Sequence, residues 1–421
     1  MSDRSGRLTR RAILKGAAIG AIGAPYVLTS AALGAAGVPP ASERVGCAVF
    51  GLGDRGPSHI GMARGHGQLV AVCDPWQDRR DHHAKANNVP GYGDFREVLA
   101  RRDVDAVFIA VPDHWHVPLA VAAARAGKDI YCEKALGLTI EQDLALWKVL
   151  KQTGRVFQYG PQRRESGQFR HACELVRNGR IGEVREVHVT AMTFGACAPR
   201  AGYQPAPPPA QLDYDLWLGP APETPYVPGR CKARGWYTIY DYCLGWISAW
   251  GSHILSILVW GWDAHKAGQV EVEGTGDIPN DGLNDNAVRW EVRFQFSSGV
   301  RMTLGTAHNS VKFVGTRGSV VAGDKGFGTE PEDLWKTEIR AEEVRLGSGS
   351  LGGNFLSCVK TRDRTISPID QAVYSDVLSH LADIAIRLRR KVTFEFETFR
   401  FPGDDEANRL RSRAMRAPWH L

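Results

Sequence analysis

The sequence predicts an α/β protein of two domains, a parallel-sheet domain over residues 41–165 and an α+β domain over residues 166–421. Short apolar runs of strand length alternate with helical segments as far as about residue 165, and this βα rhythm is typical of a parallel sheet. Beyond that point the apolar pattern changes to the period-two alternation of strands with one buried face. A chain of 421 residues is long enough for two domains of roughly 100–200 residues each.

The composition is that of an ordinary globular protein. Hydrophobic residues make up 43% and charged residues 23% of the chain, and this balance excludes a disordered chain or a fibrous repeat. The formal net charge of +6 raises the question of a nucleic-acid partner. Residues 1–37, however, hold five basic side chains and one acidic one, which account for +4 of that charge. The remaining chain is close to neutral, and we expect no nucleic-acid partner.

The first 37 residues resemble a twin-arginine export signal. Arg10 and Arg11 are followed by apolar residues and a lysine, and an Ala- and Gly-rich stretch then runs from Gly16 to Gly37. An N-terminal helix or membrane anchor is the alternative, but the stretch is weakly hydrophobic and Pro25 interrupts it. We expect export to the periplasm and cleavage near residues 31–36. We expect no later apolar run long enough to hold the mature protein in a membrane.

A glycine motif follows the first predicted strand. The apolar run Val45–Phe50 leads directly into Gly51-Leu52-Gly53-Asp54-Arg55-Gly56, and a helix is expected over 58–65. In a strand–loop–helix context this spacing is the fingerprint of a Rossmann dinucleotide site. The first glycine allows a tight turn, the second lets the backbone approach a pyrophosphate, and the third lets the helix pack closely on the strand. The N–H groups at the start of the helix then face the phosphates.

An acidic residue ends the second predicted strand. Leu69–Cys73 is followed by Asp74, 23 positions after Gly51, which is near the spacing expected for a carboxylate that binds the adenosine ribose. Because a carboxylate there repels a 2′-phosphate, the sequence favours NAD over NADP as the cofactor. The alternative is a loop with clustered glycines and an aspartate that caps a turn.

The βα rhythm continues through the rest of the first domain. We expect a helix over Asp94–Ala100, a buried strand over Ala106–Val111, a loop over Pro112–His116, a helix over Val117–Ala126 and a strand over Asp129–Cys132. Ligands bind at the carboxyl ends of parallel strands. Polar residues follow both of these strands closely. Candidate cofactor contacts there are Val111, Pro112, Asp113 and Glu133.

These motifs and several later ones resemble the Gfo/Idh/MocA family of oxidoreductases, which includes glucose–fructose oxidoreductase and inositol dehydrogenase. The matching residues are the glycine loop, Asp74, Pro112–His116, Ala126–Lys134, Trp250–His253, Gly315–Gly318 and Glu406–Arg409. The resemblance implies an NAD-binding Rossmann domain and a second domain with a large open, mainly antiparallel sheet. It also implies action on a carbohydrate hydroxyl, homo-oligomerisation through the open sheet face, and a C-terminal segment that packs back on the first domain.

The resemblance assigns roles to residues near the nicotinamide. Lys134 carries over as the group that exchanges the proton of the reacting hydroxyl, and Glu133 as the residue that orients Lys134 or the cofactor ribose. His116 and Gln162 match positions beside the nicotinamide. Each has a structural alternative: Lys134 as a surface lysine that closes a strand, His116 as a capping or packing histidine, and Gln162 as a plain turn residue. Ala135 stands where the family has a proline, which often supports a special backbone geometry.

The chain departs from the family pattern in the second domain. Many relatives carry Asp-x-Gly-x-His-x-x-Asp, whose histidine is a second proton-transfer group, but this chain has Ala249 and Ser256 at the carboxylate positions beside His253. Without the carboxylate, His253 is expected to be less basic, and packing or substrate binding is its alternative role. Asp241 is the candidate replacement carboxylate. Candidate platforms for a sugar ring, or else core aromatics, are Tyr240, Tyr242, Trp236, Trp246 and Trp250.

No metal-binding set is apparent in the sequence. His82 and His83 are adjacent on an expected helix, and adjacent helical positions do not face a common ligand. The eight cysteines do not resemble a disulfide framework, because Cys47, Cys73 and Cys132 fall in strands that we expect to be buried.

A Pro-rich insertion interrupts the second domain over Ala198–Arg230. A loop of this length is usually functional or an oligomer contact. Cys197 and Cys231 bracket the insertion and are a candidate pair for a disulfide in an oxidising compartment.

Three functions stay open from the sequence. The leading hypothesis is an NAD-dependent oxidoreductase that moves a hydride between the nicotinamide and a carbinol carbon of a sugar, glycoside or cyclitol. The second is a redox-neutral glycoside hydrolase that holds NAD tightly and works by oxidation, elimination, hydration and reduction, as some exported relatives do. The third is a non-catalytic sugar-binding protein of the same fold.

Overall fold

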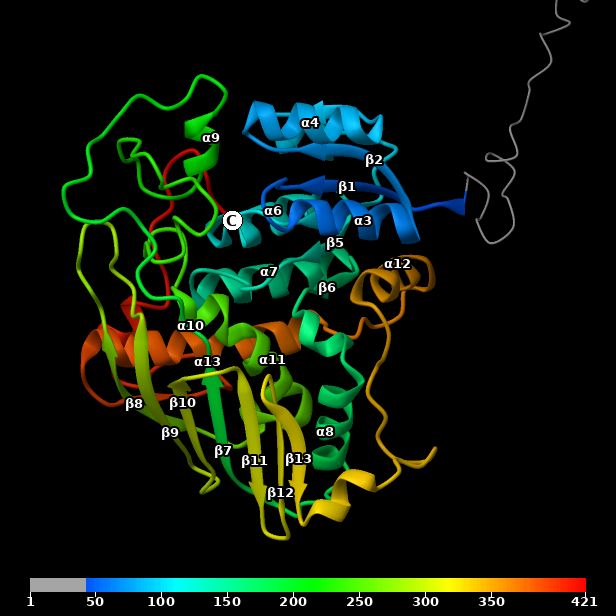
Figure 1. Ribbon diagram of the computed structural model, residues 1–421, viewed down its shortest axis with the longest axis vertical. Helices are drawn as coiled ribbons and strands as arrows, with labels where there is room; N and C mark the ends of the chain where they lie inside the picture. Colours follow the sequence, from blue (N-terminus) through cyan, green and yellow to red (C-terminus); the bar gives the residue numbers. More distant parts are fainter. Residues whose placement is uncertain (1–42) are drawn as a thin grey trace, which may run out of the picture. The chain divides into compact units, whose positions relative to one another are not determined.

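Two β-sheets organise the part of the chain that the structure describes, residues 43–421 (Figure 1). The structure is a computed structural model. The expected export signal, residues 1–37, lies outside the described residues. Among those that are described, no helix is both long and apolar enough to cross a bilayer. Residues 45–421 form one compact unit that contains both sheets.

The first sheet is parallel, as the βα rhythm predicts. Its six strands lie in the order β3-β2-β1-β4-β5-β6, which is the doubly wound order of a Rossmann domain. All residues of β1 and β4 are buried, as expected for strands that have helices on both faces. The strands are β1 (Gly46–Phe50), β2 (Gln68–Cys73), β3 (Gly91–Tyr92), β4 (Ala106–Ile109), β5 (Asp129–Cys132) and β6 (Phe157–Tyr159).

The helices that connect these strands are α3 (Gly56–His66), α4 (Gln77–Asn87), α5 (Phe95–Leu99), α6 (Asp113–Arg125) and α7 (Ile140–Thr153). The expected loop over Pro112–His116 is wrong, because residues 113–116 form the first turn of α6. Their side chains are all buried, so their polar character marks an interior site and not a solvated loop. Pro112, directly before the helix, has no N–H to leave unsatisfied, and Asp113 in the first turn suits the helix dipole.

The second sheet is mixed and mostly antiparallel, which confirms the expected fold class. Its eight strands lie in the order β13-β12-β11-β7-β10-β9-β8-β14, and the neighbouring pairs are antiparallel except β7 with β10. Residues of β9 alternate between exposed and buried, so one face packs in the core and the other meets solvent. The strands are β7 (Val184–Ala191), β8 (Val270–Asp277), β9 (Arg289–Phe296), β10 (Arg301–Thr306), β11 (Ser310–Gly315), β12 (Ser319–Gly323), β13 (Gly326–Glu330) and β14 (Val392–Phe394).

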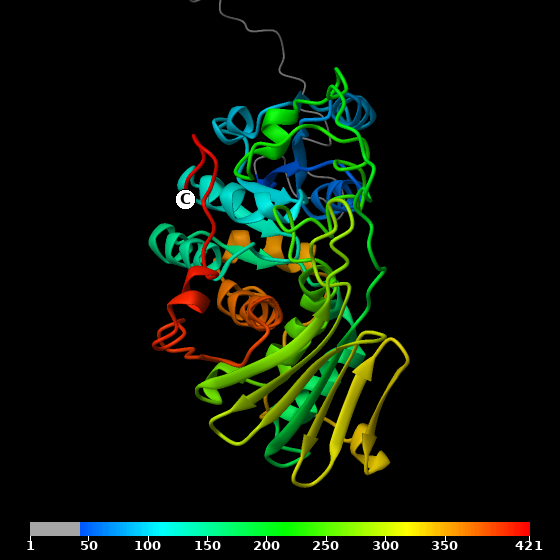
Figure 2. The ribbon, with the colours of Figure 1, turned by 90° about the vertical axis from the view of Figure 1, so that its left-hand side faces the viewer.

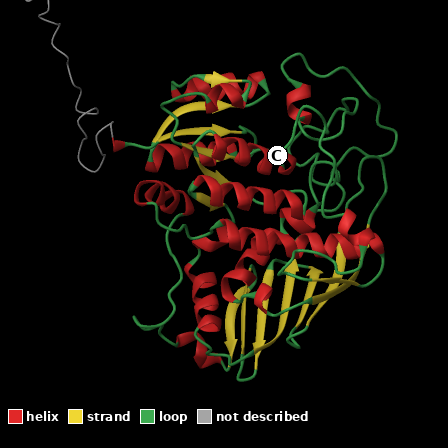
Figure 3. Cartoon of the chain, turned by 180° about the vertical axis from the view of Figure 1, so that it is seen from behind, coloured by secondary structure: helices red, strands yellow, loops and turns green. Residues whose placement is uncertain are grey.

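Helices cover one face of this sheet, as Figure 2 and Figure 3 show. The 20-residue helix α13 packs against α11 and also against α7 of the first domain. Through these contacts the two domains share one continuous hydrophobic core. The helices are α8 (Gly167–Arg177), α10 (Trp246–Ala249), α11 (Gly251–Gly261), α12 (Leu351–Thr361), α13 (Ile369–Leu388) and α14 (Asp405–Arg409), with 3₁₀ turns η2 (Gln162–Glu165), η3 (Ala264–Lys266) and η4 (Glu332–Lys336).

An irregular segment, residues 192–245, joins β7 to α10 and contains one short helix, α9 (Tyr214–Leu218). It is longer than the expected insertion, Ala198–Arg230. The segment has a small hydrophobic core of its own. It is also fastened to the first domain, since the Gln77 N–H donates to Gln211 O at 2.8 Å. The irregular segment is therefore packed structure and not a free loop.

The C-terminal segment returns to the first domain. The Trp419 ring packs against Trp115 of α6, with centroids 4.8 Å apart, and against Phe95 at 6.2 Å. Arg416 donates from Nε to Gly219 O, 3.0 Å away in the irregular segment. The last residues of the chain thus hold α6 and the irregular segment together.

Candidate cofactor and substrate site

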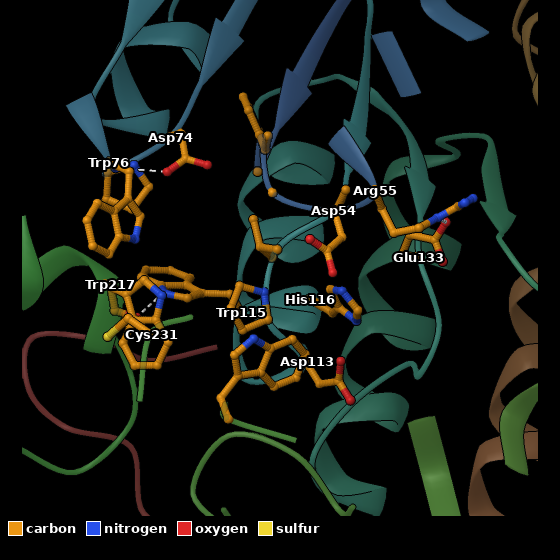
Figure 4. Close-up of a pocket in the computed structure, with 18 of the residues that line it drawn as sticks. Asp54, Arg55, Asp74, Trp76, Asp113, Trp115, His116, Glu133, Trp217 and Cys231 are labelled. Carbon is orange, nitrogen blue, oxygen red and sulfur yellow. Dashed lines mark hydrogen bonds and ion pairs between the residues drawn. The ribbon is translucent and has the colours of Figure 1, made fainter. Parts of the chain in front are cut away.

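A cavity open to solvent lies at the carboxyl ends of β1, β2, β4 and β5, where the first sheet meets the irregular segment (Figure 4). Ligands of parallel α/β sheets bind at this edge. In Figure 4, Asp74 and Trp76 lie at one end of the cavity, and Arg55 and Glu133 lie at the other. The predicted contacts Asp54, Val111 and Pro112 also line it.

The glycine loop forms one wall of the cavity. Gly51 has a φ of +85°, and a Cβ there would overlap the carbonyl oxygen of Ala110. A Cβ at Gly56 would lie 2.7 Å from Gly51 O, so the start of α3 packs tightly on the turn. Gly53 has open space by contrast, since the nearest atom to a Cβ there is an Arg79 guanidinium nitrogen at 3.6 Å. A tight turn, a close helix and one open backbone position together fit a pyrophosphate.

Asp74 is buried at the other end of the same wall. Its Oδ2 accepts a hydrogen bond from Leu52 N at 2.7 Å, and its Oδ1 accepts one from Trp76 N at 2.8 Å. Burial raises the pKa of Asp74, although these bonds and the charge of Arg79 act in the opposite direction. The carboxylate keeps further lone pairs for ribose hydroxyls. The residues present therefore fit NAD.

Glu133, directly after β5, ties the glycine loop to the residues that follow the sheet. It accepts hydrogen bonds from Gln162 Nε2 at 2.8 Å and from Arg55 Nε at 3.2 Å, and His59 Nε2 lies 3.3 Å away. Burial alone would raise the pKa of Glu133, but the charges of His59, Lys134 and Arg55 outweigh it and lower the pKa. Glu133 is thus an ionised anchor, and it brings the predicted residues Arg55 and Gln162 together.

Lys134 lines the cavity beside the second domain. Its Nζ donates to the carbonyl oxygen of Ala249 at 3.0 Å and lies 5.7 Å from the centroid of the Trp250 ring. Position 249 is where the sequence lacks the expected aspartate, and the main-chain oxygen there accepts from the lysine instead. The Lys134–Ala135 peptide bond is cis.

His116 and Asp113 form the floor of the cavity at the start of α6. Burial lowers the pKa of His116 to about 4, so the ring is neutral near pH 7. Its Nδ1 lies 2.5 Å from Ala135 O, and its Nε2 has no hydrogen-bond partner among the described residues. Burial raises the pKa of Asp113 to about 7, with the charge of Lys134 opposing it. In Figure 4 both side chains lie between the two ends of the cavity.

His253, on α11, lies close to Lys134. Its ring centroid is 5.1 Å from that of Trp250, the ring that Lys134 approaches. Burial and then the charge of Lys134 lower the pKa of His253 well below its usual value, so it is a neutral imidazole. Ser256 does not replace the missing carboxylate, because its hydroxyl donates to His253 O within the same helix at 3.1 Å.

The expectation for Tyr240 is wrong. Its ring lies between the guanidinium groups of Arg387 and Arg413, each 3.4 Å from the ring centroid. Both faces of the ring are therefore covered, and neither can stack on a sugar. Its neighbour Asp241 does not line the cavity, so the structure does not bring Asp241 to the position of the missing carboxylate.

The other candidate aromatic platforms lie in three different places. Tyr242 is buried against Trp217, with centroids 5.0 Å apart, and belongs to the core of the irregular segment. Trp236 lines the cavity. Trp246 and Trp250 lie beyond Lys134, on and next to α10.

The sequence analysis missed most of the wall that the irregular segment provides. This wall consists of Leu216, Trp217, Cys231, Ala233, Arg234, Trp236 and Tyr237, and Trp76 and Arg79 complete it from the first domain. The length of the insertion signalled a functional loop, but no periodic pattern indicated which side chains face the cofactor.

Two further expectations concern sites away from the cavity. Cys197 and Cys231 are both free thiols in the structure, so the candidate disulfide is not formed. The described residues also contain a buried cluster that no sequence motif indicated. It consists of Asp143 on α7 with Asp376 and His380 on α13, whose polar atoms lie within 4.8 Å of one another.

Comparison with known proteins agrees with this geometry. Residues 45–161 match the NAD-binding Rossmann fold of the Gfo/Idh/MocA oxidoreductase family, and residues 170–421 match the C-terminal alpha/beta domain of that family. The chain belongs to the Gfo/Idh/MocA oxidoreductase family. The resemblance inferred from the motifs is confirmed, and the first domain is an NAD-binding domain.

Similar curated proteins match over part of their length. Over 121 residues the chain is 40% identical to an uncharacterized oxidoreductase, ORF334, of Rhizobium meliloti, which covers 28% of this chain and 36% of the relative. It is 32% identical over 165 residues to scyllo-inositol 2-dehydrogenase (NAD(+)) of Bacillus subtilis, covering 38% and 48%. It is 30% identical over 159 residues to glycosyl hydrolase family 109 protein 1 of Shewanella sp. strain ANA-3, covering 35% of each. The chain thus spans about a third to a half of the curated relatives it matches.

Solved structures share the fold over most of the chain. Scyllo-inositol dehydrogenase from Lactobacillus casei, with bound NAD(H) and scyllo-inositol, matches with a TM-score of 0.58 and 18% identity, covering 83% of this chain and 99% of that one. WlbA dehydrogenase from Bordetella pertussis, in complex with NADH and UDP-GlcNAcA, matches with a TM-score of 0.62 and 16% identity, covering 83% and 98%. At these identities the likeness establishes the fold alone.

Proposed function

We propose that this protein is an NAD-dependent oxidoreductase that acts on a hydroxyl of a sugar, glycoside or cyclitol. The observation that carries the proposal is the position of Lys134. It lies on the wall of the cavity that the glycine loop and Asp74 share, and its Nζ reaches the second domain at Ala249. A bound cofactor and a substrate held by the second domain would therefore meet at this lysine.

NAD, when bound, supplies the hydride acceptor or donor. The glycine loop and the N–H groups at the start of α3 would hold its pyrophosphate, and Asp74 would accept hydrogen bonds from its ribose. Gly53 leaves room for this approach, and Arg79 borders the same space.

During oxidation Lys134, as a neutral amine, would accept the proton of the reacting hydroxyl while the hydride leaves the carbinol carbon, and during reduction its ammonium group would return that proton. The Ala249 carbonyl orients the side-chain nitrogen of Lys134 but takes no part in proton transfer. His253 is a neutral imidazole in the same neighbourhood, so it is available as a second proton acceptor. The ammonium charge of Lys134 would also stabilise negative charge that develops on the substrate oxygen.

Replacement of Lys134 tests the proposal. In Lys134→Ala we expect the reduction of NAD by a reacting sugar to slow by roughly 10²–10⁴-fold, the usual contribution of a general acid–base group. The measurement is nicotinamide absorbance with a panel of sugars, glycosides and cyclitols. Bound NAD is quantified in parallel, so that loss of cofactor is not mistaken for loss of catalysis. Equal rates in the variant and the wild type would contradict the role of Lys134.

A redox-neutral glycoside hydrolase is the second candidate function. The match to glycosyl hydrolase family 109 proteins of Shewanella supports it, as does the wall of the irregular segment, which encloses the cofactor site. In that reaction the hydride returns to the product, so an aglycone is released without net NADH. Aglycone release together with constant nicotinamide absorbance would favour the hydrolase over the dehydrogenase.

We also propose twin-arginine export and a homo-oligomer formed through the open face of the eight-stranded sheet. The motif at Arg10 and Arg11 supports the first, and the family resemblance supports the second. Fractionation of cells that express Arg10→Lys/Arg11→Lys should show retention in the cytoplasm. Light scattering of the purified protein should give a multiple of the monomer mass.

A further inference from the structure

Phe194 is a large hydrophobic residue on the surface near the substrate end of the site. Among the described residues, the exposed large hydrophobics are Phe194 at 45%, Tyr203 at 39% and Val344 at 49%. Single exposed apolar residues are common on protein surfaces and need no explanation by themselves. What sets Phe194 apart is how its backbone is held and which side chains surround its ring.

The backbone on both sides of Phe194 is fastened. The Thr193 hydroxyl donates to Val288 O at 2.7 Å. The indole Nε1 of Trp246 donates to Gly195 O, also at 2.7 Å, and Gly195 has a φ of +72° that favours glycine. Phe194 therefore stands out from a fixed segment that follows β7, and its exposure is not that of a loose loop.

A chain of aromatic rings connects Phe194 to the reacting groups. The Phe194 ring centroid lies 5.0 Å from that of Trp246 and 5.7 Å from that of Trp250. Trp250 in turn lies 5.7 Å from Lys134 Nζ and 5.1 Å from the His253 ring. Trp250 is thus shared by the proton-transfer groups and by the exposed phenylalanine. The Trp250 ring separates Phe194 from Lys134. If a reacting sugar contacts Lys134, Phe194 is therefore about one sugar ring farther out.

Arg234 adds hydrogen-bond donors to the same place. Its guanidinium carbon lies 5.1 Å from the Phe194 ring centroid, and the residue also lines the cofactor cavity. Its φ of +62° is uncommon for a residue other than glycine and marks a specially held backbone. The Cys197 thiol contributes to that hold, since it donates to Arg234 O at 2.9 Å. A guanidinium offers five N–H donors in a planar array.

An aromatic face beside N–H donors suits a sugar ring, which has an apolar C–H face and a rim of hydroxyl acceptors. We propose that Phe194, Trp250 and Arg234 form an outer subsite that binds the second ring of a glycoside, the ring attached to the one that reacts. The buried Trp246 supports Phe194 from behind. The substrate is then a glycoside and not a free monosaccharide or cyclitol. This inference rests on the proposed action at a carbohydrate hydroxyl.

Binding to the NAD-loaded protein tests the subsite. The probes are aryl glycosides and disaccharides of common hexoses, each paired with the corresponding free sugar, and affinity is measured by titration calorimetry. We expect at least one glycoside to bind about tenfold more tightly than its free sugar. Phe194→Ala should remove most of this advantage, roughly 3- to 10-fold as for the loss of one aromatic contact, and should leave binding of the free sugar unchanged.

Two control variants define the result. Tyr203→Ala removes another exposed aromatic of the irregular segment and should change neither affinity. Phe194→Trp keeps an aromatic face and should preserve the preference for the glycoside. Equal affinity for both members of every pair, an equal loss for both in Phe194→Ala, or no binding by any probe would overturn the subsite. A lower oligomer mass of Phe194→Ala in light scattering, with unchanged glycoside affinity, would assign Phe194 to a contact between copies and would also overturn it.

The subsite and the proposed function can fail separately. If free sugars reduce the cofactor in a Lys134-dependent way with no preference for glycosides, the oxidoreductase stands and the subsite does not. If glycosides bind in a Phe194-dependent way but neither reduce the cofactor nor release an aglycone, the subsite stands and the proposed catalysis does not.

Discussion

The cofactor end and the substrate end of the cavity are built in different ways. At the cofactor end, regular elements and main-chain atoms set the shape, since the turn at Gly51 and the hydrogen bonds to Asp74 are backbone features. At the substrate end, side chains of the irregular segment line the cavity, and the carbonyl oxygen of Ala249 at the end of α10 holds Lys134. A site determined by the backbone leaves a motif in the sequence, whereas a site built from packed aromatics on irregular backbone leaves little.

The largest expected effect separates two glycines of the same motif. Gly51→Ala places a Cβ on Ala110 O at a φ of +85°, so we expect the free energy of unfolding to fall by about 3 kcal/mol. Gly53→Ala meets only open space and should stay within about 1 kcal/mol of the wild type. It should instead weaken NAD binding, because the added methyl group occupies the approach of the phosphates.

Urea denaturation without NAD measures the first effect, and calorimetric titration with NAD measures the second. If both variants lost stability equally, the tight turn at Gly51 would not set the shape of the cofactor end.

The next effect concerns the junction of the two domains. His380 Nε2 lies 3.4 Å from Oδ2 of both Asp143 and Asp376. Burial lowers the pKa of His380, but the two carboxylates outweigh it and raise the pKa to about 9. Burial and then the charge of Asp376 raise the pKa of Asp143 to about 8. Both groups therefore bind a proton more tightly in the folded state than in the unfolded state.

Stability that depends on such protons is present at low pH and is lost as the pH rises. The loss for His380 runs from its ordinary pKa of 6.5 to about 9, and that for Asp143 runs from 3.8 to about 8. Between pH 6.5 and 9 we expect the free energy of unfolding to fall by on the order of 3 kcal/mol. Asp143→Asn should flatten this slope, and Lys391→Gln, which breaks an exposed ion pair with Glu271, should not. A slope that Asp143→Asn leaves unchanged would contradict the assignment.

The smallest expected effect lies at the cofactor end of the cavity. Trp76 lines the cavity beside Asp74, and the Arg79 guanidinium carbon is 5.1 Å from the centroid of its ring. Trp76→Ala should weaken NAD binding by about tenfold, the effect of losing one good aromatic contact. Trp147→Ala is the matched control, because it removes a tryptophan with a similar cationic neighbour, Lys151, away from the cavity. An equal loss of NAD affinity in both variants would point to general destabilisation.

The sequence predicts β1, β2, β4 and β5 of the first domain, because buried parallel strands are short apolar runs and the glycine loop has fixed spacing. It gives no bounds for β3 and β6, which are two and three residues long and leave no apolar run of strand length. Nor does it predict the start of α6, since buried polar residues such as Asp113 and His116 look like a loop. Tyr240 and Asp241 were assigned to the substrate site because they precede α10 closely in the sequence. The sequence does not reveal that Arg387 and Arg413 cover the Tyr240 ring. Phe194 had no signal at all, since only the fold brings the end of β7 to Trp246 and Trp250.

The hydrogen bond from Lys134 to the carbonyl oxygen of Ala249 has a consequence for how this site tolerates change. A side-chain acceptor at position 249 would disappear with a single substitution, whereas a main-chain acceptor survives replacement by any residue that fits the same space. Ala249 is itself buried in the hydrophobic core, which limits such replacements to small residues. The orientation of the lysine is therefore insulated from small-residue changes at that position and depends instead on the backbone of α10 keeping its place.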